Sequence, residues 1–328
     1  MAELNKIESI TEEQWFLVNE ENRKMVSEFL EQSTQLSPQT IKQYTSGLRI
    51  YFWWVSAFAE NKPFHEIRSI DYLKYQNFLV KNGLSSSAIK FKRSAVSSFN
   101  NYVETYYSDQ FKTFRNYITK AISNPPPVFV NEKEPLTLEE YKLLCETLEK
   151  QEMWQQLAYL KFSFSTGCRR AEARQLLKEV VNYEPKIIQK EDIEIKTYFT
   201  HPIRCKGRGV SGKVRKLQFD EEAMIAIKKW LGIRGEDDCP HVFVAKSKSK
   251  YKQVGEGTFN NWANNYFEKI VGRRFHPHLI RETRATTLVV EQGKDIKAAQ
   301  KLLDHQSSTT TEIYVIRKDE NDADEAFT

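Results

Sequence analysis

The sequence lacks the features that would place it in a membrane. No apolar run approaches the roughly 20 residues that a membrane-spanning helix needs. The first residues, MAELNK, have neither the basic nor the apolar region of a signal peptide. Cysteine is scarce, with four widely spaced residues and no C-x-x-C pair. These absences predict a cytoplasmic protein with no membrane partner, in which the thiols are reduced and lie in or near cores.

A large excess of one charge is also absent. The chain has 49 Lys and Arg against 44 Asp and Glu, a formal net charge of +5. This balance permits binding to a polyanion only if the basic side chains gather on one face. The hydrophobic share of 40% and the charged share of 28% are typical of a globular protein, and 328 residues suffice for two domains.

The pattern of the first 124 residues predicts an all-helical bundle. A Glu-rich lead-in helix is expected within the first thirty or so residues, followed by a helix that begins at Ser37-Pro38, an N-cap with proline in the first turn. A third helix starts near residue 69 and ends at Asn82-Gly83, and a fourth follows Ser85. The apolar stripe expected on the fourth helix consists of Ala88, Phe91, Ala95, Phe99 and Tyr102.

A proline run marks the expected domain boundary. Pro125-Pro126-Pro127 favours an extended spacer, which we place at residues 125–135. The domain at 136–328 then begins with a capping box, Thr137-x-x-Glu140. It is expected to be mostly α, with a small antiparallel sheet in which residues 193–199 pair with 214–219. The expected helices cover residues 138–150, 153–165, 169–178, 221–231, 258–271, 278–291, 296–303 and 309–316.

Five side chains, of which two share one predicted helix, suit the chemistry of a phosphodiester. Arg169 follows the break Thr166-Gly167, at a predicted helix start, where the backbone dipole also favours an anion. His278 and Arg281 lie three residues apart, on one helical face. His305 ends a helix, and Tyr314 follows it by nine residues. Taken singly, each is more often a surface or packing residue.

Together these groups form a set that attacks a phosphate without a cofactor. The arginines and histidines would surround the non-bridging oxygens with positive charge. A tyrosine hydroxyl would then attack the phosphorus and form a covalent phosphotyrosine, which preserves the energy of the broken bond for later joining. Neither ATP nor a metal ion is required, and we expect no small-molecule cofactor.

The order of these elements resembles the tyrosine recombinase (phage integrase) family, as an Xer-like member with two domains. The shared order is T-G-x-R-x-x-E, a Lys-Gly hairpin, H-x-x-R, and a histidine nine residues before a tyrosine. The resemblance implies that Arg169 and Arg281 bind the scissile phosphate. It further implies that His278 assists proton transfer, that His305 donates to a phosphate oxygen, and that Tyr314 is the nucleophile.

The resemblance also implies a lysine on the hairpin that protonates the departing 5′ oxygen. Lys206, in the segment CKGRG, is the candidate, and Lys213 in the same loop is the reserve assignment. Three positions depart from the usual pattern near the reacting groups: Glu282 stands where a second histidine is common, Asp304 replaces a common glycine before His305, and Ile280 replaces leucine. The stretch 180–203 is longer than compact members need.

The resemblance implies a helical, SAM-like core-binding domain at 1–124, followed by the linker and a catalytic domain at 136–328. Double-stranded DNA is the expected partner, bound by a homotetramer on two DNA sites, with a Holliday junction midway through strand exchange. The expected phosphate contacts of the first domain, for which a merely solvated face is an equal alternative, are Lys42, Lys90, Lys92 and Arg93.

Three other functions are alternatives to site-specific recombination. A type IB topoisomerase uses a similar set of side chains, but it acts as a monomer and does not exchange strands. A DNA-binding regulator that had lost its chemistry would not need every reacting side chain to be present. A metal-dependent nuclease needs a compact set of Asp and Glu residues, which the sequence does not show around the candidate site.

Overall fold

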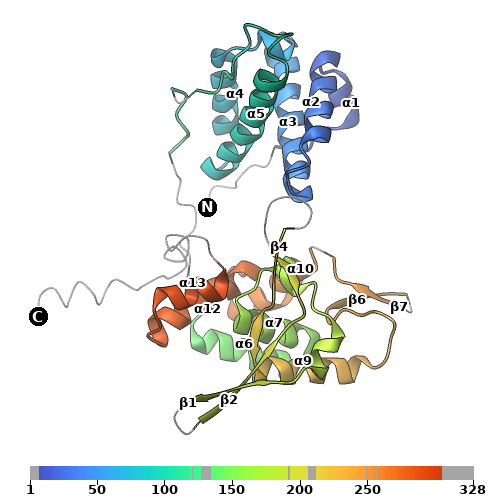
Figure 1. Ribbon diagram of the computed structural model, residues 1–328, viewed down its shortest axis with the longest axis vertical. Helices are drawn as coiled ribbons and strands as arrows, with labels where there is room; N and C mark the ends of the chain where they lie inside the picture. Colours follow the sequence, from blue (N-terminus) through green and yellow to red (C-terminus); the bar gives the residue numbers. More distant parts are fainter. Residues whose placement is uncertain are drawn as a thin grey trace, which may run out of the picture. The chain divides into compact units, whose positions relative to one another are not determined.

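The computed structural model describes residues 7–119, 121–126, 134–190, 193–205, 212–248, 250–255 and 257–304, which form two compact units. The N-terminal unit contains the described residues up to 126, and the C-terminal unit contains nearly all of those from 134 onward (Figure 1). Each unit has its own hydrophobic core. Most of the predicted linker falls outside the described residues. Across the described ranges, no helix has both the length and the apolarity to cross a bilayer.

The N-terminal unit is helical, as predicted. Ser37 caps α3 by accepting a hydrogen bond from the Thr40 N–H at 3.1 Å, and Ser85 caps α5 in the same way through Ala88 at 3.2 Å. The predicted single lead-in helix is instead two helices, because the Asn19 side chain caps the start of the second. The helices are α1 (Glu12–Phe16), α2 (Glu20–Gln32), α3 (Pro38–Phe58), α4 (Ser69–Lys81) and α5 (Ser86–Tyr106).

The buried face of α5 differs from the predicted stripe. Phe91 is 36% exposed, whereas Ile89 and Val96 are buried. The difference arises where α5 packs against α3: a Cβ atom on Gly47 would lie only 3.5 Å from the Ala95 Cβ. The face around Ala95 is thus a contact between the two helices, and the Phe91 ring lies against Tyr44 of α3, with ring centroids 5.7 Å apart.

The C-terminal unit is built around α7 (Trp154–Thr166), which packs against α6 (Leu138–Lys150), α9 (Glu221–Arg234) and α12 (Pro277–Thr286). Its apolar side chains are buried on several faces; the Tyr159 ring, for example, stacks on Phe259 with centroids 4.1 Å apart. The predicted helix at 258–271 is α10 (Thr258–Trp262), a π-helical turn and α11 (Glu268–Val271). A second π-helical turn, Thr287–Glu291, continues α12, and α13 (Ile296–Leu303) follows.

The observed strand pairing differs from the predicted single sheet. Residues 193–199 do form a strand, β2 (Ile193–Phe199), but its partners are β1 (Lys186–Lys190), which was missed, and β5 (Gln218–Asp220). A separate antiparallel pair joins β3 (Ile203–Cys205) to β4 (Lys213–Arg215). The segment predicted to return as one strand therefore divides between two sheets. A third pair, β6 (Val244–Ser247) and β7 (Lys250–Gln253), was also missed.

The helix predicted at 169–178 is mostly wrong. Only α8 (Arg170–Ala173) is α-helical, and a 3₁₀ turn occupies Lys178–Asn182. The Gln175 and Leu176 N–H groups still donate to carbonyls three residues back, but the backbone then bonds to distant residues. The Lys178 N–H donates to the Pro240 carbonyl at 2.7 Å, and the Val242 N–H donates to the Leu176 carbonyl at 2.8 Å. Tertiary hydrogen bonds thus replace the helical ones that local pattern favoured.

Candidate functional site

Arg281 is the most deeply placed of the candidate residues. It lies on α12, is fully buried, and donates to two backbone carbonyls, those of Gly167 and Leu303, each at 2.6 Å. These carbonyls belong to the ends of α7 and α13, so one guanidinium joins three helices. His278, one turn earlier on α12, is partly buried. The helix starts where predicted, because the His276 ring accepts from the Leu279 N–H at 3.0 Å and Pro277 occupies the first turn.

Arg169 is held by a buried carboxylate. Its Nη1 lies 3.0 Å from Glu172 Oε1, and its backbone N–H donates to Glu172 Oε2 at 3.2 Å. The Glu172 side chain is 1% exposed and that of Arg169 is 28% exposed. The guanidinium is therefore fixed at its base and still accessible. Since α8 has only four residues, the helix dipole expected at Arg169 is small, and the fixed charge is the main electrostatic feature.

Two residues of this site were not singled out from the sequence. Glu172 also pairs with Arg215, 3.4 Å away, and Arg215 Nη1 donates to the Leu302 carbonyl at 2.8 Å. The R-x-x-E spacing could have revealed the contact between Arg169 and Glu172. The contacts of Arg215 have no local signal, because residues 172, 215 and 302 are far apart in the chain and meet only in the folded unit.

Gly167 permits the end of α13 to lie against α7. Its φ is +59°, a left-handed conformation that favours glycine. A Cβ atom at this position would come within 2.4 Å of Leu303 Cδ2. A side chain here would displace the Leu303 side chain, in a residue whose carbonyl Arg281 binds. The break predicted at Thr166-Gly167 is thus confirmed, and the glycine also has a packing role.

Three cations meet at the C-terminal end of α13. The Leu302 carbonyl accepts from Arg215 and the Leu303 carbonyl from Arg281. The Asp304 carboxylate lies 2.5 Å from the Lys213 ammonium. The last carbonyl groups of a helix have no partner within the helix, and positive charge is favourable there. These contacts bring α12 and β4 to the same helix end, which directly precedes His305 in the sequence.

Of the six predicted catalytic residues, three lie in the described part of the chain. Arg169 and Arg281 are brought to one site through Glu172, Arg215 and the end of α13, and His278 lies on the same helix as Arg281. The other three, Lys206, His305 and Tyr314, lie outside the described residues, and their roles stay predictions.

The basic residues predicted to contact DNA have different surroundings in the N-terminal unit. Lys42 on α3 and Lys90 on α5 are exposed. Lys92 is half-buried, and this burial lowers the pKa of its ammonium. Arg93 donates to the backbone carbonyls of Thr119, at 2.8 Å, and Ile122, so it holds the segment after α5. A groove of about 280 Å³ runs beside Lys90 and Arg93.

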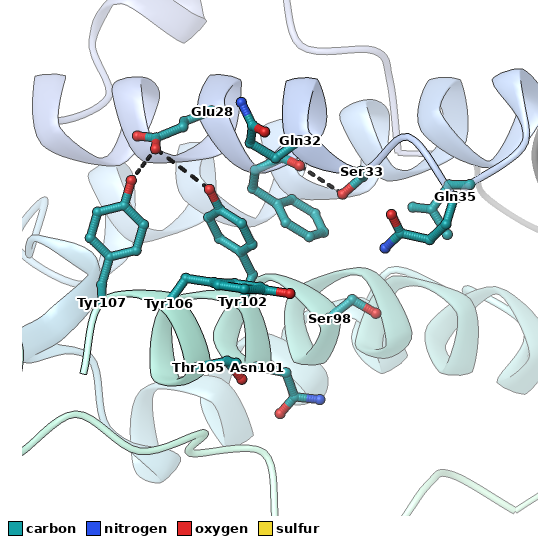
Figure 2. Close-up of a pocket in the computed structure, with 12 residues that line it drawn as sticks. Glu28, Gln32, Ser33, Gln35, Ser98, Asn101, Tyr102, Thr105, Tyr106 and Tyr107 are labelled. Atoms are coloured by element: carbon teal, nitrogen blue, oxygen red, sulfur yellow. Dashed lines mark hydrogen bonds between the residues drawn. The ribbon is translucent and has the colours of Figure 1, made fainter.

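A larger groove of about 620 Å³ lies between α2 and α5 (Figure 2). The hydroxyl groups of Tyr102 and Tyr107 both donate to the Glu28 carboxylate. The bond to Glu28, together with desolvation, raises the pKa of Tyr107 above its usual value. Glu28 is the one charged residue among those that line the groove, so its electrostatics do not suit a phosphate.

The cysteines fit the predicted reduced state. All four are free, and three of them are buried. Burial raises the pKa of the Cys145 thiol to about 11 and that of Cys168 to about 12, which keeps both protonated at neutral pH. Within the described ranges, no group of three or more His, Cys, Asp or Glu side chains is arranged to hold a metal ion.

The C-terminal unit is mainly α and fixes several cations at the end of α13. Together with the accessible Arg169, they form a candidate phosphate-binding site. The sequence profile of the Phage integrase family matches residues 134–321, more than half of the chain. That of the Phage integrase, N-terminal SAM-like domain matches residues 27–105. The chain therefore belongs to the phage integrase family and is a site-specific recombinase of the tyrosine type, as predicted.

Similar proteins cover nearly the whole chain. The SPbeta prophage-derived recombinase-like protein YomM of Bacillus subtilis (strain 168) is 32% identical over 98% of this chain and 95% of its own length. The tyrosine recombinase XerC of Oceanobacillus iheyensis is 27% identical over 88% of each chain.

Solved structures agree with the fold. The Tn1549 transposon integrase in complex with transposon right end DNA has a TM-score of 0.64 and 15% identity, over 93% of this chain and 98% of that one. The XerH site-specific recombinase bound to palindromic difH substrate has a TM-score of 0.63 and 20% identity, over 88% and 78%. The predicted fold class, a SAM-like helical domain plus a mostly α domain with small antiparallel sheets, is confirmed.

Proposed function

We propose that the protein cleaves and rejoins DNA through a 3′-phosphotyrosyl intermediate on Tyr314. The observation that carries this proposal is the fixing of Arg281 between the carbonyls of Gly167 and Leu303. A buried guanidinium held by two backbone oxygens cannot reorient, so its charge is already in place when a phosphate binds. Such preorganisation stabilises the charge that develops in a transition state.

In the proposed cleavage step, the Tyr314 oxygen forms a bond to phosphorus while the bond to the 5′ oxygen breaks. Arg169 and Arg281 stabilise the charge on the non-bridging oxygens, with His305 as a further donor. His278 assists removal of the phenolic proton, and Lys206 supplies the proton that the departing oxygen takes. Joining is the reverse reaction, in which a 5′ hydroxyl attacks the phosphotyrosine and releases the phenol.

We propose that the N-terminal unit, taken as residues 1–124, contributes affinity for the duplex backbone. The groove beside Lys90 is also lined by Arg93, whose guanidinium donates to the Thr119 and Ile122 carbonyls and adds positive charge, and by Ser94 and Ser97, whose hydroxyl groups suit phosphate oxygens. The DNA-bound relatives support double-stranded DNA as the partner. Exchange of four strands then requires a homotetramer on two DNA sites, with a Holliday junction as the intermediate.

The test uses DNA that the wild-type protein traps covalently, whose sequence identifies the recombination site. With a nicked duplex of that sequence, the wild-type protein should form an adduct that survives denaturing electrophoresis. Tyr314→Phe should bind the same DNA and form no adduct, because the attacking oxygen is missing. Tyr266→Phe, at a tyrosine that is 40% exposed and belongs to none of the motifs, is the matched control. An adduct with Tyr314→Phe would refute the assignment. With supercoiled DNA that carries the same sequence, relaxation without recombinant product would favour a topoisomerase.

A further inference from the structure

Asp304 occupies an unusual position next to the proposed reacting groups. It ends α13 with a φ of +55°, a left-handed conformation in which glycine is favoured. Its side chain is 25% exposed and its Oδ1 lies 2.5 Å from the Lys213 ammonium. Asp304 is therefore an acidic residue in a strained backbone conformation, close to guanidinium groups that are proposed to bind a phosphate. This combination suggests that its side chain has a function.

The ion pair is one of two links between β4 and the end of α13. Lys213 and Arg215 are two residues apart on the strand, so their side chains leave it on the same face. Lys213 binds the Asp304 carboxylate, and Arg215 binds the carbonyl of Leu302. Of the two links, only the one through Asp304 depends on a side chain of α13, and only that one would be lost if residue 304 were glycine.

The carboxylate is charged under ordinary conditions. Partial burial alone would raise the pKa of Asp304, but the hydrogen bond and the charge of Lys213 outweigh it. Arg215 and Arg169 add to the same effect, so the pKa is lowered overall. A carboxylate this close to Arg169 would repel a phosphate unless it were neutralised, and the Lys213 ammonium does this. The pair is therefore suited to holding the strand without adding net charge to the site.

We propose that Asp304 is a positioning residue for proton delivery to the leaving oxygen, acting through Lys213 to hold the β3–β4 hairpin against the end of α13. The inference rests on the proposed function. In the sequence, Lys206 directly follows β3, and His305 directly follows Asp304. The ion pair thus ties together the two chain segments that contain the proposed proton donor and a proposed phosphate contact. Lys213, the reserve assignment for the donor, has a structural role in this scheme.

The reaction offers a way to separate proton delivery from every other step. When the phosphorus–oxygen bond breaks, the 5′ oxygen must take a proton from the Lys206 ammonium, which becomes a neutral amine. A sulfur atom in the same bridging position leaves as a stable thiolate and needs no proton. Variants impaired only in proton delivery should therefore cleave the sulfur-bridged substrate at the wild-type rate.

The experiment compares cleavage rates of nicked duplexes that have oxygen or sulfur at the bridging 5′ position. On the oxygen substrate, Asp304→Asn and Lys213→Gln should each be slower by roughly tenfold, a part of the hundredfold or more that a positioned acid contributes. The double variant should be no slower than either single variant, because both remove one interaction. On the sulfur substrate all three should match the wild type. Lys216→Gln, an exposed lysine just beyond β4, should cleave both substrates normally.

Asp304→Gly separates positioning from folding, because it relieves the backbone strain and also removes the carboxylate. It should melt no lower than the wild type and still lose about as much rate on the oxygen substrate as Asp304→Asn. Equal losses on both substrates, additive losses in the double variant, or a normal rate for Asp304→Asn with oxygen would each overturn the proposal. Failure of the proposed function is distinct, since it would appear as Lys206→Ala or Tyr314→Phe behaving like the wild type.

Discussion

The exposed lysines Lys42 and Lys90 of the N-terminal unit are held differently from the cations of the C-terminal site. In the C-terminal unit, Arg281 and Arg215 are bound to backbone carbonyls, and Arg169 is bound to a buried carboxylate. In the N-terminal unit, Lys42 and Lys90 project from the exposed surfaces of α3 and α5. Fixed charges stabilise a transition state because they need no reorganisation, whereas mobile charges suffice to attract a polyanion. The contrast predicts that substitutions at the exposed lysines of the N-terminal unit change the affinity for DNA. Substitutions at the fixed cations of the C-terminal unit should change the cleavage rate.

The largest expected effect comes from Arg281→Lys. An ammonium cannot span the carbonyls of Gly167 and Leu303, so the charge would lose its fixed orientation. Cleavage of a nicked duplex should fall by about a hundredfold or more, while DNA binding changes little. Arg234→Lys is the matched control, because Arg234 is also buried and also binds backbone carbonyls, those of His241 and Cys239. It should lower stability and leave the rate of the folded protein unchanged; equal rate losses would contradict the distinction.

The next largest effect concerns the packing of the end of α13 against Gly167. Gly167→Ala should lower the free energy of unfolding by about 2 kcal/mol or more, from backbone strain and the clash with Leu303 together. Gly272→Ala provides the comparison, since Gly272 has a φ of +72° and no atom within 4 Å of the added Cβ. Chemical denaturation measures both. The Gly167 variant should also cleave more slowly at temperatures where it remains folded, and loss of stability alone would show that Leu303 can move without cost to the site.

A smaller effect is expected at the surface of the N-terminal unit. Lys90→Gln should weaken DNA binding severalfold at low salt and reduce the slope of log affinity against log salt by about 1, because one phosphate contact is lost. The cleavage rate of saturated complexes should not change. Lys24→Gln, at an exposed lysine of α2 that pairs with Glu20, is the control. Affinity measured by fluorescence anisotropy at several salt concentrations decides the matter, and an unchanged slope would exclude a phosphate contact by Lys90.

The smallest effect concerns pH and the start of α6. The hydrogen bonds from Arg273 are the main reason that the pKa of Glu140 is lowered. The stabilisation is therefore complete above the usual carboxyl pKa of about 4.3 and is lost as the pH falls through the lowered value. Glu140→Gln retains the capping acceptor and should lose about 1 kcal/mol or less at pH 7, and this deficit should shrink as the pH falls below about 4.3. Glu146→Gln, at an exposed position of the same helix, should show neither change. A deficit that persists in acid would point to packing rather than charge.

Local signals explain why much of the fold was predictable. The caps at Ser37, Ser85 and Thr137 and the break at Gly167 are short-range features, and each lies where it was predicted. The strands were less predictable, because their pairing depends on partners distant in the sequence. Residues 214–219 look like one strand, yet Val214 pairs with Arg204 and Phe219 pairs with Tyr198. The helix expected at 169–178 failed for the same reason.

The sequence by itself determined the candidate reacting groups and the family to which the chain belongs, because residue types and their order do not depend on the fold. Only the tertiary structure decided that Arg281 is buried between two helix ends, that Glu172 binds both Arg169 and Arg215, and that Asp304 meets Lys213. Apart from the local Arg169–Glu172 pair, each of these contacts joins elements far apart in the chain. Their geometry is set by how helices and strands pack, and no local pattern records it.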